Sequence, residues 1–280
     1  MNRLIKKVHE VWLETLMASF MSQASHTKQS LIEFSDIMFR HFTWLERYAI
    51  THNIVYDYDR DAIPIKVDKL EVILHDIIQR LRDIDLQLDY CEDEALKKRI
   101  NTDIAYIIFA ISQLPNETVS AFDMQRTLQG IELTPEATDA LTLFLFEESY
   151  KEYELIMVYN YLKAHTQDKY LADIFNILID ESFFHFRSFG DMMAQMGILG
   201  VPRVICKESY EISDMASFLQ NGIQEEIGAK EECRKLSEAV AKESPQLAQF
   251  FDFINHQENY HISLMNDALA YYAQEEDKYV

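Results

Sequence analysis

The chain has 280 residues, which is long enough for one large domain or two ordinary ones. Apolar residues make up 48% of it and charged residues 26%, which is the composition of a folded protein rather than of a disordered one. The formal net charge of −21 would repel a phosphate backbone, so nucleic-acid binding is not expected. Only six glycines and five prolines are present, too few for a β-rich protein with many tight turns, and this favours an all-α fold.

The cysteines and the apolar runs indicate the cellular location of the protein. Cys91, Cys206 and Cys233 are far apart and form no Cys-x-x-Cys pair, which fits a reducing cytoplasm. The apolar run that begins at Ile104 has eight residues, well short of the ~18 that span a membrane. We therefore expect a cytoplasmic protein that does not enter a membrane.

Segments of helical period alternate with short polar breaks through the first half of the chain. Glu71 and His75 are spaced i, i+4 on one of these segments, but the next offers only Asp103, so a complete metal site is not expected here. We interpret residues 1–130 as a helical module, either a degenerate form of the bundle expected in the second half or an unrelated one. The helices expected in it span 3–24, 27–52, 67–90, 93–113 and 121–129.

A marked break precedes the second half. Thr134, Pro135 and Glu136 supply an N-cap, a proline at the first helical position and an acid in the first turn. We place a domain boundary there, with a second domain over 134–275. A longer connection, 198–212, is expected to join its two helical hairpins. The four helices expected in this domain span 135–166, 168–197, 213–242 and 245–275.

Each of these four helices carries acids or histidines within its apolar face. On the first of them, Glu148 and Glu152 interrupt a stripe of leucines that repeats at alternating spacings of four and three residues. Burying a carboxylate without a partner is costly, so acids within an apolar stripe indicate a cation that faces them. The polar positions of the other three stripes are Glu181 and His185, Glu226, and Glu258 and His261.

One carboxylate from each of two helices, with a Glu/His pair from each of the other two, is the ligand set of dinuclear iron and manganese bundles. Four carboxylates neutralise two divalent ions, and imidazoles suit iron or manganese better than calcium or magnesium. The alternative is a non-catalytic helical protein for binding or assembly, with the polar stripe filled by salt bridges. Lys230 is a candidate cation for this, but one lysine cannot balance four inward carboxylates, so this interpretation ranks second.

On these residues, the segment from Thr134 to about Tyr272 resembles the ferritin-like superfamily, and within it the rubrerythrin-like bundles. The resemblance implies a four-helix bundle that holds two iron or manganese ions. It implies that Glu181 and Glu258 bridge the ions, that Glu148 and Glu226 are terminal ligands, and that each histidine holds one metal. The metal-binding residues implied in this way are Glu148, Glu181, His185, Glu226, Glu258 and His261.

The sequence departs from the family pattern at one pair. The family uses Glu-x-x-His twice, whereas the pair of Glu181 and His185 is one residue longer. Both spacings keep the two side chains on one face of a helix.

The resemblance also implies a function, a redox enzyme of the oxidase, peroxidase or hydroxylase type whose small-molecule oxidant is dioxygen or peroxide. Rubrerythrins carry a Cys-x-x-Cys iron site that this chain lacks, so an external electron donor is expected. The substrate is left open between ferrous iron, peroxide and an organic or tRNA base, and a homodimer is also left open. Iron storage ranks lower, because the N-terminal module is awkward for cage assembly.

Overall fold

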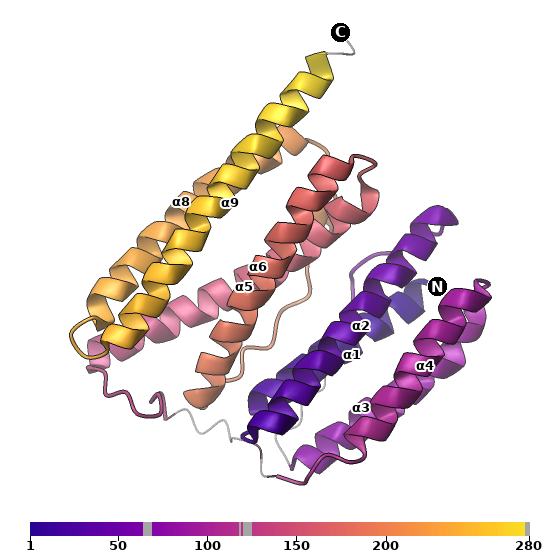
Figure 1. Ribbon diagram of the computed structural model, residues 1–280, viewed down its shortest axis with the longest axis horizontal. Coiled ribbons are helices and arrows are strands. Elements are labelled where there is room, and N and C mark those ends of the chain that lie inside the picture. Colours follow the sequence, from indigo (N-terminus) through magenta and orange to yellow (C-terminus); the bar gives the residue numbers. More distant parts are fainter. Residues whose placement is uncertain (64–68, 118, 120–124, 278–280) are drawn as a thin grey trace. The chain divides into compact units, whose positions relative to one another are not determined.

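The computed structural model describes the chain except for residues 64–68, 118, 120–124 and 278–280, and except for the side chains of 275–277. The described residues form an all-α protein, as the composition predicted, and contain no β-strand (Figure 1). Within this described part, we find no helix with the length and apolar character that crossing a membrane requires.

The helices cluster into two compact units. Unit 1 comprises residues 1–124 together with 197–207, and unit 2 comprises residues 125–196 together with 208–280. The segment 197–207, most of which we expected to serve as a connection within the second domain, therefore belongs to unit 1. There the guanidinium of Arg60 donates hydrogen bonds to the carbonyl oxygens of Pro202, at 2.8 Å, and Arg203, at 3.2 Å.

Unit 1 is built around its first helix, most of which is buried, polar residues such as His9 and Glu14 included. This helix packs on the second and third helices, and the fourth helix contacts both of those. The elements of unit 1 are α1 (Asn2–Met21), α2 (Ser25–Thr51), α3 (Leu70–Gln87), the 3₁₀ turn η1 (Leu88–Tyr90) and α4 (Glu94–Ile111).

Unit 2 consists of two helical hairpins and a short helix between them. The long helices are α5 (Pro135–His165), α6 (Lys169–Gln195), α8 (Met215–Val240) and α9 (Pro245–Asp277), and the short one is α7 (Lys207–Tyr210). α5 packs along α6 and α8 packs along α9, while further contacts join α5 to α8 and α6 to α9 (Figure 1). The four long helices agree with the expected ranges to within a few residues.

One expected helix is wrong. Residues 121–124 of the expected helix 121–129 lie outside the described residues, and 125–129 are not helical. Instead, Leu128 and Ile131 form an isolated antiparallel bridge around a turn in which Gly130 has a φ of 78°. The positive φ explains the glycine, since side chains disfavour that conformation.

Candidate metal centre

The four long helices of unit 2 bring acids and histidines into its interior. The side chain of His185 is fully buried, and those of Glu152, Glu226, Glu258 and His261 are at most 8% exposed. Apolar residues occupy the positions above and below them on each stripe, so the same pattern that buries the leucines also buries these polar groups. Glu181 is less enclosed, with 23% of its side chain exposed.

The first group of potential ligand atoms joins α5, α6 and α9. Nδ1 of His185 lies 2.8 Å from Oε1 of Glu152 and 3.7 Å from Oε1 of Glu258. Nε2 of the same imidazole lies 3.2 Å from the amide oxygen of Gln257. Three side chains therefore fix the orientation of the His185 ring, and the ligand atoms of Glu152, His185 and Glu258 lie within 4.8 Å of one another.

The second group joins α8 and α9, with a contact from α6. Nδ1 of His261 lies 3.0 Å from Oε2 of Glu258 and 3.5 Å from Oε1 of Glu226. Nε2 of His261 lies 2.5 Å from Oε2 of Glu181. The ligand atoms of Glu226, Glu258 and His261 again lie within 4.8 Å of one another.

Glu258 belongs to both groups. Its Oε1 faces His185 and its Oε2 faces His261, and the centroids of the two imidazole rings are 5.7 Å apart. The two groups are therefore adjacent halves of one cluster, which we call the Glu258 cluster: Glu152, Glu181, His185, Glu226, Glu258 and His261.

The protonation of the cluster follows from its burial and its charges. Burial and the neighbouring Glu226 raise the pKa of Glu258 well above its usual value. Burial would also raise the pKa of Glu226, but hydrogen bonds with Glu258 and His261 outweigh it and lower that pKa. The two shifts favour one shared proton on this pair of carboxyl groups.

Both imidazoles are favoured in their charged form. Burial alone would lower the pKa of His185, but the carboxylate of Glu152 outweighs burial and the pKa rises to about 9. Burial acts in the same direction on His261, and its contacts with Glu181, Glu226 and Glu258 raise its pKa to about 12.

Glu148, which the resemblance implied as a ligand, lies in neither group. It is buried on α5, but its Oε1 lies 2.6 Å from Nζ of Lys151, three residues along the same helix. Glu152, one turn further along α5, lies beside His185 instead. The sequence placed both acids on the stripe, so the signal for Glu152 was present, but spacing alone did not rank it above Glu148.

The i, i+4 pair on α6 serves both groups. His185 belongs with Glu152 and Glu258, whereas the nearest partner of Glu181 is His261 of α9. The backbone of α6 is α-helical throughout this stretch, so the longer spacing does not disturb the helix.

Two uncharged side chains are close enough to respond to the cluster. Burial raises the pKa of the Tyr159 hydroxyl, and the charges of Glu226, Glu152 and Glu258 add to that effect. Burial also raises the pKa of the Cys233 thiol, with Glu258 as the largest charged contributor. Both groups therefore stay protonated beside the carboxylates.

Where the structure describes them, lysine and arginine side chains are not among the ion-pair partners of the buried carboxylates of the cluster. Within the described part of the chain, no lysine or arginine forms an ion pair with Glu152, Glu226 or Glu258. Among the described residues, the ion-pair partners of these three carboxylates are therefore the two histidines.

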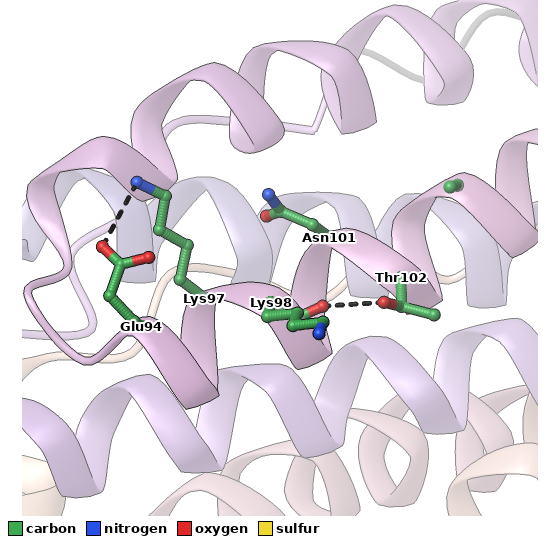
Figure 2. Close-up of a pocket in the computed structure, with 6 residues that line it drawn as sticks. Glu94, Lys97, Lys98, Asn101 and Thr102 are labelled. Carbon is green, nitrogen blue, oxygen red and sulfur yellow. Dashed lines mark hydrogen bonds and ion pairs between the residues drawn. The ribbon is translucent and has the colours of Figure 1, made fainter.

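A surface pocket on α4, in unit 1, has a different character. It has a volume of about 620 Å³ and is lined by Glu94, Lys97, Lys98, Asn101, Thr102 and Ala105, all from one helix (Figure 2). Lys97 already pairs with Asp89, at 2.7 Å, and with Glu94, at 3.9 Å. Groups from a single helix do not converge on a ligand from several sides, so the Glu258 cluster is the stronger candidate.

Comparison of the chain with protein-family models, curated protein sequences and solved structures gives no match. The functional interpretation therefore rests on the residues and their geometry.

Proposed function

We propose that unit 2 binds two iron or manganese ions, and that the protein is a redox enzyme that acts on dioxygen or peroxide. The observation that carries the proposal is the position of Glu258, whose two oxygens face two different imidazoles. Such a carboxylate is arranged as a bridging ligand for a pair of ions, as in dinuclear helical bundles. The resemblance of the four polar stripes to ferritin-like proteins supports the same interpretation.

The charge of the cluster supports a cationic ligand. Four carboxyl groups, when ionised, carry four negative charges against at most two positive charges from His185 and His261. Two divalent ions with neutral imidazoles would bring the same set to neutrality. In addition, Oε2 of Glu152 is buried and has no hydrogen-bond partner among the described residues, and such an oxygen is costly unless something binds it.

The donor set fits the proposed metals. Glu152, His185 and Glu258 would hold one ion, and the second would be held by Glu226, Glu258 and His261. Mixed carboxylate and imidazole donors suit iron and manganese, whereas calcium and magnesium prefer oxygen alone. When bound, the two ions would supply the electrons that reduce the oxidant.

The remaining polar residues would position the ligands. In each imidazole, Nδ1 faces the carboxylates that would share its metal ion. Nε2 is left to donate a hydrogen bond, from His185 to Gln257 and from His261 to Glu181. Outer hydrogen bonds of this kind fix the tautomer and the ring orientation of metal-binding histidines. Glu181 is therefore proposed to orient His261 rather than to bridge the ions.

A second candidate function, non-catalytic binding or assembly, is favoured by one specific observation. Each histidine already has a carboxylate partner, with His185 2.8 Å from Glu152 and His261 2.5 Å from Glu181. With pKa values of about 9 and about 12, both imidazoles are cations at neutral pH. The cluster would then be a structural network of ion pairs that holds the helices together.

Metal content separates the two candidates. Protein purified from its native metal supply is expected to carry two iron or manganese ions per chain, counted by elemental analysis, and metal-free protein would favour the structural network. Glu258→Ala should abolish binding of both ions, because it removes a ligand from each group. Glu225→Ala is the matched control, since Glu225 is an exposed acid one residue from Glu226 on α8. Equal metal content in the two variants would contradict the proposed site.

A further inference from the structure

A second pocket in unit 1 combines aromatic and cationic groups. It lies where the last turns of α2 approach the first turns of α4, and it has a volume of about 430 Å³, within the range of small-molecule sites. α2 contributes Trp44, Arg47 and Tyr48, His52 directly follows its end, and α4 contributes Arg99. Unlike the pocket of Figure 2, this one is lined from two helices, so its groups converge.

The aromatic wall is held in place by its neighbours. The guanidinium carbon of Arg40 lies 5.3 Å from the centroid of the Trp44 ring, and the ring of the buried His41 lies 5.7 Å from it. One helical turn further on, the rings of Tyr48 and His52 stack with centroids 4.0 Å apart. The indole is only partly buried, so it offers surface for a planar ring to stack on.

The cationic groups reach the pocket from both helices. Nε of Arg99 lies 3.3 Å from Oδ2 of Asp103, which also lies 3.0 Å from Nε2 of His41. This contact uses Nε of Arg99, and 57% of the Arg99 side chain is exposed. Arg47 has no ion pair within the described part of the chain, and its side chain is exposed.

The local charge is opposite in sign to that of the whole protein. Among the residues that line the pocket, Arg47 and Arg99 supply two positive charges against the carboxylate of Asp93. Asp93 is engaged as the N-cap of α4, where it accepts hydrogen bonds from two backbone amides. In a chain with a formal charge of −21, a net positive pocket is a specific feature that favours an anion.

We propose that this pocket binds a small molecule made of a planar aromatic ring and an anionic group, either a carboxylate or a phosphate. The ring would stack on Trp44, and the anionic group would pair with Arg47 and Arg99. A guanidinium matches both anions because its N–H groups form a fork that binds two oxygens at once. The site is independent of the metal centre, which is built from residues of unit 2.

Four probes test the proposal on the full chain by calorimetry. Adenosine monophosphate and benzoate contain a ring and an anion, whereas adenosine and inorganic phosphate contain only one of the two. At least one of the first pair is expected to bind with a Kd below about 1 mM and about tenfold tighter than either single-feature probe. Which of the two binds distinguishes a phosphate ligand from a carboxylate ligand. The absence of binding by both would overturn the proposal.

The variants locate the binding. Arg47→Ala should weaken binding about tenfold without harming the fold, because Arg47 has no ion pair to lose. Lys98→Ala is the matched control, since Lys98 is an exposed cation beside Arg99 that does not line this pocket. Quenching of tryptophan fluorescence should accompany binding and disappear in Trp44→Leu, because the other tryptophan, Trp12, is fully buried. Unchanged affinity in Arg47→Ala, or quenching that persists in Trp44→Leu, would refute the site.

Discussion

The two units bury carboxylates in different ways. In unit 1 the buried acids Glu46 and Glu14 lie beside tyrosine hydroxyls and an arginine, respectively. Glu46 is fully buried and accepts hydrogen bonds from the hydroxyls of Tyr56, at 2.9 Å, and Tyr58. Glu14 lies 3.1 Å from Nε of Arg80. Arg80 does not fully satisfy Glu14, because Oε2 of Glu14, like Oε2 of Glu152, has no hydrogen-bond partner among the described residues.

Unit 2 instead gathers its acids around shared partners. Glu152, Glu226 and Glu258 lie around two histidines, and Glu258 contacts both. Burial and the neighbouring Glu226 raise the pKa of Glu258, so the crowded carboxyl groups favour a shared proton. The comparison teaches that a buried acid alone does not indicate a metal site. What distinguishes the Glu258 cluster is that its acids face two histidines, which can bind a metal ion, whereas Glu14 faces an arginine, which cannot.

Sequence spacing alone does not make this distinction. Glu71 and His75 on α3 have the same i, i+4 spacing as Glu181 and His185 on α6, yet both residues of the α3 pair are exposed. The apolar face of α3 runs through other positions, such as Ile77, and that face packs on α1. A spacing therefore becomes chemically informative only when the apolar stripe passes through it.

Two acids on α5 allow the most direct test of this difference between the units. One of them is paired with a cation, as in unit 1, and the other belongs to the cluster. Glu148 pairs with Lys151, whereas Glu152 contacts His185 and carries an unsatisfied buried oxygen. We expect Glu152→Ala to lose one of two bound ions and Glu148→Ala to keep both, measured by elemental analysis of purified protein. If Glu148→Ala loses metal and Glu152→Ala does not, Glu148 is the ligand, as the resemblance implied, and the present assignment is wrong.

The buried acid Glu14 should make the stability of unit 1 depend on pH. Burial raises the pKa of Glu14 from 4.5 to about 8, although Arg80 opposes the shift. Between these two pH values the folded state holds a proton that the unfolded state has released, so unit 1 should lose stability as the pH rises through this window. The loss should be on the order of 2–4 kcal/mol. Glu14→Gln should remove most of this dependence, because glutamine does not titrate.

Tryptophan fluorescence makes that measurement specific to one unit. The chain has two tryptophans, Trp12 and Trp44, and both lie in unit 1. Thermal melts followed at pH 5 and pH 8 therefore report on unit 1 without interference from unit 2. Glu71→Gln is the control, since Glu71 is exposed at the start of α3. A wild-type melting temperature that is equal at the two pH values would contradict the prediction.

The sequence predicted the helices better than it predicted the contacts between them. Pro135 and Pro245 begin α5 and α9 at the expected residues, because a proline at the first helical position is a local signal. The choice between Glu148 and Glu152 was not local, because both lie on the same stripe and only the packing of α6 and α9 decides which one meets His185. Likewise, residues 125–129 of the expected helix 121–129 are not helical, because Arg126 has a φ of 56° and Leu128 forms a bridge with Ile131.

The smallest expected effect concerns how the helices begin. Thr134 caps α5 by accepting a hydrogen bond from the amide of Ala137 at 3.3 Å, whereas α1, α2 and α3 have no side-chain cap. Thr134→Ala should therefore destabilise α5 by about 1 kcal/mol, which would appear as faster hydrogen exchange in its first turns. Thr138→Ala is the matched control, because it makes the same change one turn inside the helix, where alanine has the higher helix propensity and no cap is lost. The long hydrogen bond and the proline at the next position limit the effect, since Pro135 already favours the helical φ at the start of α5. If exchange in the first turns of α5 is the same in the two variants, the cap contributes nothing and the start of the helix is set by its proline and its packing alone.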